Sequence, residues 1–127
     1  MTKNSIVITG TVIRGLHYGT ALGFPTANLD RRQFSRMRIK IKLGVFQGWA
    51  ELPSARKYTA AIVIGPIDKT GLPKIEAHLL GFKGNLYGKK ILLQIGKFIR
   101  EFKKFPGEAE LKIQIKEDIK IIKNISK

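Results

Sequence analysis

The stretch GTALGFPTANL, residues 19–29, is the most distinctive part of the chain. Two glycines and a proline interrupt it, so we expect a shaped loop and neither a helix nor a regular strand. Thr26 and Asn28 stand two residues apart and would share one side of an extended backbone. A hydroxyl and a carboxamide oxygen so placed could share a hard cation such as Mg²⁺. Residue chemistry alone favours the alternative, an ordinary turn in which Asn28 closes an Asx hydrogen bond.

Length and composition set the broad class of protein. The 127 residues suffice for one hydrophobic core, and 43% of them are apolar. The absence of cysteine excludes disulfides and thiolate metal sites and fits a reducing compartment. No apolar run approaches the ~20 residues of a membrane helix, and the N-terminus lacks a signal-peptide pattern. We therefore expect one cytoplasmic, monomeric domain spanning residues 1–127, without a membrane partner.

The net charge of +15 is unusual for a chain of this size. Such a charge attracts polyanions, and residues 31–42 carry six basic side chains and no acidic one. A scattered excess of lysine is more often a solvated surface. A basic β-barrel that binds single-stranded nucleic acid remains an alternative. We do not expect that partner, because most aromatic residues lie in apolar strands or glycine loops.

Short alternating segments between turns predict a mainly β protein. Gly10, inside the first segment, suggests a bulge or a close backbone approach. Close spacing of the segments favours a small six-stranded antiparallel barrel with a Greek-key-like path. We expect strands at residues 5–13, 38–43, 45–52, 57–64, 74–82 and 89–98.

The C-terminal segment fits two patterns. Residues 111, 113 and 115 alternate as in a strand, whereas Leu111, Ile115, Ile119 and Ile122 share one face of a helix. Acidic residues at 108 and 110 favour a helix that begins there. We predict a helix from residue 107 to about 124, with its isoleucine face packed on the outside of the barrel.

Residues 22–29, LGFPTANL, resemble the signature of the riboflavin kinase (flavokinase) family, and the frame Gly10-Thr11-Val12 to Gly15 fits the same family. The resemblance runs from residue 6 to about residue 119. It implies a kinase that transfers the γ-phosphate of ATP to the 5′-hydroxyl of riboflavin to give FMN, with Mg²⁺ accompanying ATP. Many bacterial relatives carry an adenylyltransferase domain ahead of the kinase domain; nothing in this chain resembles it, so FMN is the expected product.

The resemblance also implies roles for single residues. The segment Ile75-Glu76-Ala77-His78-Leu79 is similar to the one that supplies the catalytic glutamate, which makes Glu76 the expected general base. Residue type alone favours a solvent-facing glutamate paired with a lysine. His78 would be a neighbour on the same face. The implied nucleotide-binding residues are Gly15, Thr20, Thr26, Asn28, Leu79, Gly81 and Tyr87; Thr26 and Asn28 would hold the metal, and Arg100, Lys103 and Phe105 would bind flavin.

Three positions depart from the family pattern. Thr20 stands where a basic residue is frequent, Ile41 where a proline is common, and Glu101-Phe102 replaces the usual Pro-Glu after Arg100. The first departure removes a possible phosphate contact, and the last alters the loop expected to line the flavin. A flavin-binding module without catalytic activity is therefore a third hypothesis.

Overall fold

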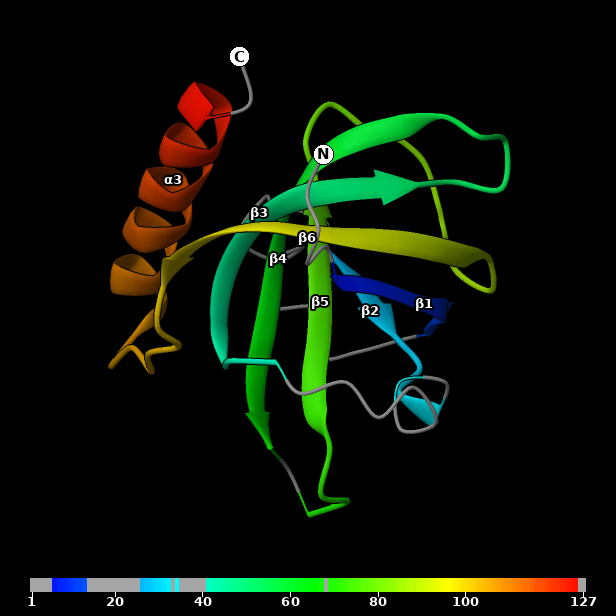
Figure 1. Ribbon diagram of the computed structural model, residues 1–127. Coiled ribbons are helices and arrows are strands. Elements are labelled where there is room, and N and C mark those ends of the chain that lie inside the picture. Colours follow the sequence, from blue (N-terminus) through cyan, green and yellow to red (C-terminus); the bar gives the residue numbers. More distant parts are fainter. Residues whose placement is uncertain (1–5, 14–25, 33, 35–40, 68, 126–127) are drawn as a thin grey trace.

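The computed structural model describes residues 6–13, 26–32, 34, 41–67 and 69–125. Within these residues, six antiparallel strands close into a barrel in the order β1-β2-β5-β4-β3-β6, with helix α3 outside (Figure 1). This confirms the fold predicted from the sequence. The elements are β1 (Ile6–Ile13), β2 (Ala27–Leu29), β3 (Gly44–Glu51), β4 (Lys57–Ile67), β5 (Pro73–Leu79), β6 (Lys90–Arg100) and α3 (Glu108–Ile125).

Strand β2 corrects one expectation. The segment 19–29 was expected to be a loop throughout, but Ala27–Leu29 pairs with β1 on one side and with β5 on the other. Ala27 and Leu29 point into the core, and Asn28 between them does not. Pairing on both edges stabilises a strand of three residues that local sequence preference would not support.

The strand expected at residues 38–43 is wrong in the part that the structure describes, since residues 41–43 are not in a strand. Ile41 and Leu43 nevertheless pack against the core while Lys42 is exposed. The alternating pattern therefore reflects a connecting segment that lies on the barrel, without a hydrogen-bonded neighbour that would make it a strand.

Strand alternation places the core inside the barrel. Ile8 and Val12 of β1, Ile62 of β4 and Leu93 of β6 are buried there. Gly10 lets the β2 end approach β1, because a Cβ at this position would lie 3.1 Å from the Asp30 carbonyl oxygen. The β1–β6 register continues through Gly10 without a shift, so the glycine serves a close approach and not a bulge.

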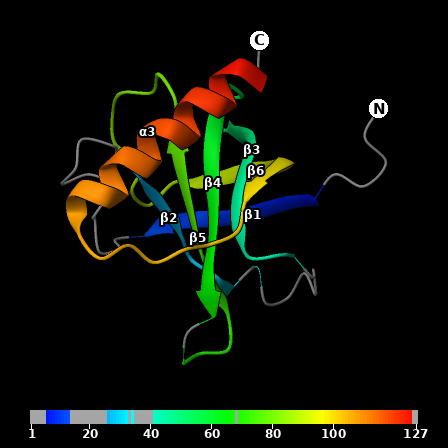
Figure 2. The ribbon, with the colours of Figure 1, turned by 90° about the vertical axis from the view of Figure 1, so that its left-hand side faces the viewer.

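Helix α3 follows the predicted bounds to within a residue. Glu108 and Glu110 lie in its first turn and Lys123 in its last, as the helix dipole favours. Ile115 and Ile122 are buried where α3 packs on the outer side of β3 and β4 (Figure 2). No helix among the described residues is long and apolar enough to cross a bilayer.

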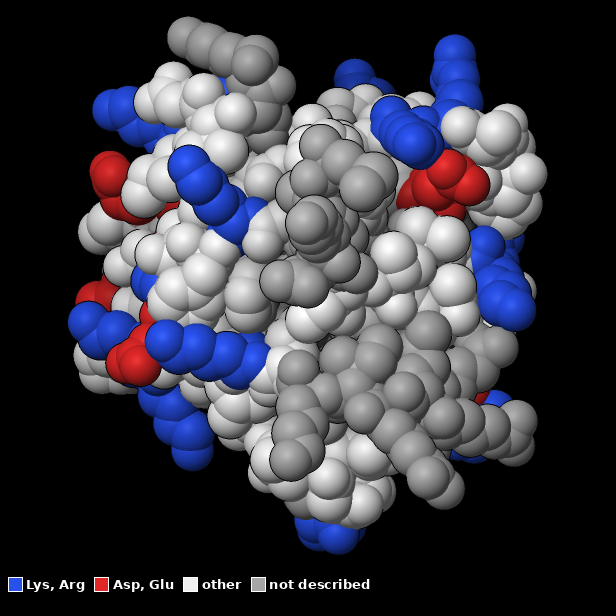
Figure 3. Space-filling model, in the orientation of Figure 1, with Lys and Arg blue, Asp and Glu red and all other residues white. Residues whose placement is uncertain are grey.

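Positive charge is spread over the surface. In the view of Figure 3, lysine and arginine side chains are scattered among uncharged residues, and acidic side chains are fewer. The surface ion pairs within the described residues include Lys57–Glu51 and Lys42–Glu101, both between exposed groups. Pairs of this kind contribute little to stability.

Candidate active site

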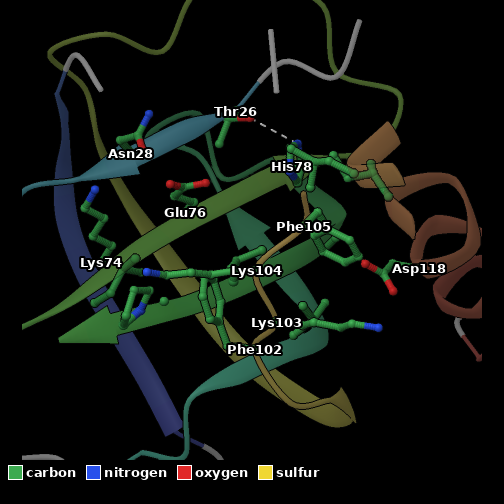
Figure 4. Close-up of a pocket in the computed structure, with 18 of the residues that line it drawn as sticks. Thr26, Asn28, Lys74, Glu76, His78, Phe102, Lys103, Lys104, Phe105 and Asp118 are labelled. Carbon is green, nitrogen blue, oxygen red and sulfur yellow. Dashed lines mark hydrogen bonds between the residues drawn. The ribbon is translucent and has the colours of Figure 1, made fainter. Parts of the chain in front are cut away.

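The pairing of β2 with β5 brings the predicted catalytic residue and the predicted metal-binding residues together. Asn28 lies directly opposite Glu76 in the antiparallel register, and Ala27 lies opposite Ala77. Directly opposed residues have Cβ atoms about 5 Å apart. Because the alanines face the core, Asn28 and Glu76 face outward, as do Thr26 and His78 one step away on the same side (Figure 4).

These four side chains line a cavity of about 680 Å³ between the barrel and α3. Its floor is the outer face of β4 and β5, including Ala61 and Val63, and Leu111 and Ile115 of α3 form part of its wall. Residues of the segment between β6 and α3 complete the lining, among them Phe102, Lys103 and Phe105. A mostly apolar cavity of this size with a few convergent polar groups fits a small-molecule site.

Glu76 is partly removed from water. Burial raises the pKa of its carboxyl group above the ordinary glutamate value, and the positive charge of Lys74 acts in the opposite direction. A carboxylate with a raised pKa is a stronger base than an exposed one, and its acid form persists to higher pH. Glu76 is therefore half-buried in the cavity, whereas the alternative expected a solvent-facing side chain, and its role as a base stays a prediction.

The Thr26 hydroxyl contacts a histidine. Thr26 Oγ1 and His78 Nδ1 lie 3.2 Å apart, within hydrogen-bond distance. The His78 side chain is buried, although its sequence position suggested only a neighbour of Glu76. In the sequence, the apolar Ala77 stands between the polar Glu76 and His78, and this alternation indicated that Glu76 and His78 share one face of the strand.

Arg100, predicted to bind flavin, is held by α3. Its Nε and Nη2 atoms donate to the two carboxylate oxygens of Asp118 at 2.9 and 2.8 Å, and Nη1 donates to the Glu101 carbonyl oxygen at 3.1 Å. Gln114 donates a further hydrogen bond to Asp118 at 2.9 Å. Asp118 is almost fully buried, with 6% of its side chain exposed. This bidentate ion pair fastens the end of β6 to the helix.

The segment 101–107 carries the remaining flavin-binding candidates. Phe105 lines the cavity, with the Arg100 guanidinium 5.7 Å and the Lys103 ammonium 5.6 Å from its ring centre. Phe102, which belongs to the Glu101-Phe102 departure from the family pattern, lines the same cavity. Two aromatic rings and a lysine therefore lie together in the lining of the cavity, and their flavin-binding role stays a prediction.

Among the described residues, three other predicted nucleotide-binding residues, Leu79, Gly81 and Tyr87, do not line this cavity. Leu79 follows His78 at the end of β5, Gly81 adopts a positive φ of 81° just beyond it, and Tyr87 is half exposed. The turn after Tyr87 is bonded to the end of β1, because Gly88 N–H donates to Val12 O at 2.9 Å. Gly15 and Thr20 lie outside the described residues. The nucleotide-binding role of all five stays a prediction.

Sequence reasoning missed several residues at the cavity. Asp118 interrupts the apolar face of α3, and an acid at a buried helical position signals a specific partner. Lys74, Arg31 and Lys104 gave no such signal, since single basic residues are common throughout this chain. Arg31 Nη1 donates to the Leu72 carbonyl oxygen at 3.0 Å.

The cavity presents oxygen donors for a hard cation. Among the described residues, no three histidine, cysteine, aspartate or glutamate side chains cluster as a metal site. Thr26 and Asn28 offer a hydroxyl and an amide oxygen on one side of β2, a donor set suited to Mg²⁺ when phosphate and water oxygens supply the other ligands. The residues present therefore fit a nucleotide-bound cation.

A closed barrel with a carboxylate and cation-type oxygen donors in an external cavity suits a phosphoryl-transfer protein. The family model described as Flavokinase (riboflavin kinase) matches residues 2–126. The chain belongs to the riboflavin kinase family.

Curated relatives agree with this family. A bifunctional riboflavin kinase/FMN adenylyltransferase of Haemophilus influenzae is 33% identical over 119 residues, covering 91% of this chain and 37% of the relative. An RNA-binding riboflavin kinase, RibR, of Bacillus subtilis is 34% identical over 119 residues, covering 91% of this chain and 49% of the relative. The chain thus spans half or less of the length of these relatives.

Two solved structures share the fold. A Streptococcus pneumoniae protein whose structure is titled as a macrolide-efflux protein has a TM-score of 0.80 and 27% identity, covering 93% of this chain and 38% of that one. A riboflavin kinase from Trypanosoma brucei has a TM-score of 0.68 and 24% identity, covering 98% of this chain and 82% of that one. At that identity the second likeness bears on the fold alone.

Proposed function

We propose that this chain is an ATP:riboflavin 5′-phosphotransferase. The γ-phosphoryl group of ATP passes to the 5′-oxygen of riboflavin, the bond from the γ-phosphorus to the bridging oxygen breaks, and FMN, ADP and the hydroxyl proton are released. The observation that carries the proposal is the common face of β2 and β5, where Thr26, Asn28 and Glu76 meet in one cavity. Family membership supplies the substrate class.

Glu76 has the placement of a general base in this reaction. It lies on the cavity floor, and burial raises the pKa of its carboxyl group. It would accept the proton of the riboflavin 5′-hydroxyl as that oxygen attacks phosphorus. Lys74 opposes the effect of burial on the pKa of Glu76, which favours the ionised form that a base requires.

Thr26 and Asn28 would hold Mg²⁺ together with the ATP phosphates. When bound, the ion would neutralise charge on the transferred phosphoryl group and orient it. The flavin would lie at the other end of the cavity, with its ring against Phe105 and Phe102 and with Lys103 at its rim. Aromatic rings and a nearby cation suit a flat polar heterocycle. Arg100 would act indirectly by holding the end of β6 against Asp118.

The predicted nucleotide-binding residues extend this arrangement. Strand β5 runs from Glu76 through His78 to Leu79, where it ends, and Gly81 follows. The adenosine end of ATP would therefore lie toward Leu79, Gly81 and Tyr87, and the chain beyond β1 would contribute Gly15 and Thr20. We also propose that residues 1–127 act as one cytoplasmic, monomeric kinase domain.

The test is direct. Purified protein is mixed with riboflavin, ATP and Mg²⁺, and FMN is sought by chromatography with a parallel reaction containing EDTA. FMN formed only with Mg²⁺ supports the proposal. Flavin binding without FMN formation would instead favour the module without catalytic activity.

The nucleic-acid alternative has weaker support. A stacking surface needs open aromatic faces, yet Phe98 packs edge-to-face on Phe46, and the Lys42 ammonium lies 4.3 Å from the Phe98 ring centre. Binding of single-stranded RNA that weakens steeply with salt, at an affinity comparable to that for nucleotides, would revive this alternative.

A further inference from the structure

His78 and Thr26 form a cross-strand pair beside the pair of Glu76 and Asn28. The Thr26 Oγ1 and His78 Nδ1 atoms are 3.2 Å apart, and both side chains line the cavity (Figure 4). His78 is only 8% exposed, so its ring is held in place by its surroundings. Each proposed metal-binding residue on β2 therefore faces a polar partner on β5.

The direction of this hydrogen bond determines what Thr26 offers to the cavity. A hydroxyl has one proton and two lone pairs. If Thr26 donates its proton to His78 Nδ1, both lone pairs remain for other partners. If a protonated Nδ1 donates to Thr26, one lone pair is used and the hydroxyl proton must point elsewhere. Only the first arrangement keeps both oxygen lone pairs out of the bond to His78.

We propose that His78 is a positioning residue for the metal-binding hydroxyl: its unprotonated Nδ1 accepts the Thr26 proton and turns the oxygen lone pairs toward the nucleotide-bound cation. The inference rests on the proposed function, in which Thr26 holds that cation. His78 touches neither the phosphate nor the flavin in this arrangement. It acts through Thr26, as partners of metal ligands commonly do.

A spectroscopic experiment tests the direction of the hydrogen bond without any assay of activity. The chain contains two histidines, so ¹⁵N spectra of the intact, ligand-free protein are simple, and a His17→Gln variant assigns them. We expect the His78 Nδ1 resonance of an unprotonated nitrogen and a proton on Nε2. A directly bonded proton on Nδ1 would overturn the proposal.

Substitutions test the consequence for metal binding. His78→Leu removes the acceptor, whereas His78→Asn can retain an oxygen acceptor near the position of Nδ1. We expect His78→Leu to raise the Mg²⁺ concentration required for half-maximal ADP binding by roughly tenfold or more, the usual scale for losing a partner of a metal ligand. His78→Asn should recover most of this loss, and FMN affinity should be unchanged in both variants.

A double-variant cycle separates positioning from general packing. Thr26→Val removes the hydroxyl, and in that background His78→Leu should have little further effect on the Mg²⁺ requirement. Thr59→Val, the same substitution on strand β4 outside the cavity, is the matched control and should leave the requirement unchanged. Additive effects of Thr26→Val and His78→Leu, or equal loss of Mg²⁺·ADP and FMN affinity in His78→Leu, would overturn the proposal.

Failure of the proposed function would look different. In that case the wild-type protein would form no FMN, while the ¹⁵N spectrum and the Mg²⁺·ADP titrations would still decide the role of His78. If His78→Leu does not fold, His78→Asn and the wild-type spectrum remain informative.

Discussion

Burial raises the pKa of the Glu76 carboxyl group, and Glu76 lies directly opposite Asn28 in the β2–β5 register. Replacement by glutamine preserves size and removes the proton acceptor, so turnover should fall by ~10²-fold or more while the affinities for FMN and Mg²⁺·ADP are retained. Steady-state kinetics and calorimetry measure the two effects. Glu117→Gln on the exposed side of α3 is the control. Undiminished turnover in Glu76→Gln would remove this residue from the mechanism.

The ionised carboxylate of Glu76 should lower the free energy of unfolding. Burial raises the pKa of Glu76 in the folded state above its unfolded value, so on raising the pH the unfolded chain loses its proton first and stability falls. The loss is complete above the folded-state pKa and absent below the unfolded-state pKa. Glu76→Gln should therefore unfold at a higher temperature than wild type at pH 8, and the difference should shrink toward pH 4. A difference that grows on acidification would contradict the burial effect.

For single residues, the sequence predicted which side chains lie in the cavity better than it predicted which side chains contact each other. The resemblance pointed to Thr26, Asn28 and Glu76, and all three share the cavity. Arg100 also lines the cavity, and its flavin-binding role stays a prediction. Its ion pair with Asp118 was not predicted, because a contact across 18 positions depends on how α3 packs. Local pattern contains no information about that packing angle.

The ion pair between β6 and α3 sets the geometry of the segment that joins them. Asp118→Ala would leave the Arg100 guanidinium, 22% exposed, without its carboxylate partner. We expect a destabilisation of about 2–4 kcal/mol, the lower end of the range reflecting the partial exposure of Arg100. Flavin affinity should also fall, because Phe105 and Lys103 lie on the loosened segment, while Mg²⁺·ADP affinity is maintained. Urea unfolding and riboflavin fluorescence titration measure these effects.

Neighbouring positions on α3 provide the controls for this prediction. Glu117→Ala removes an exposed acid one residue away and should change stability by no more than about 0.5 kcal/mol. The double variant Arg100→Met/Asp118→Leu replaces the pair with apolar groups and should recover much of the stability lost in Asp118→Ala. Equal stability of Asp118→Ala and wild type would show that the ion pair does not hold the helix.

Elements differed in how well the sequence predicted them. The helix was predictable because its apolar spacing and acidic first turn agree over 18 residues. Strand β2 was not, because three residues become a strand only through pairing with β1 and β5. The prediction of a strand that includes residues 41–43 was wrong for the opposite reason. Alternation indicates that one side of a segment is buried, but a strand also needs a hydrogen-bonded neighbour.

For the whole molecule, the spacing of the expected strands predicted the barrel. The arrangement of the described strands and helix does not explain the net charge of +15. Self-repulsion among so many lysines destabilises a compact state. On α3, Lys112, Lys116 and Lys120 are exposed and spaced four residues apart, so adjacent members repel along one side of the helix.

Lys116→Gln should therefore stabilise the protein. It removes two like-charge pairs, each worth about 0.2–0.5 kcal/mol at low salt, and no acidic residue stands three or four positions from Lys116 to offset the gain. The gain should disappear near 0.5 M NaCl, where exposed charges are screened. Glu117→Gln is a control of opposite sign, because Glu117 stands three positions before Lys120, and its loss should slightly destabilise the helix at low salt. Thermal unfolding at two salt concentrations measures both variants. A Lys116→Gln gain that persists at high salt would arise from helix propensity or packing and would contradict the repulsion argument.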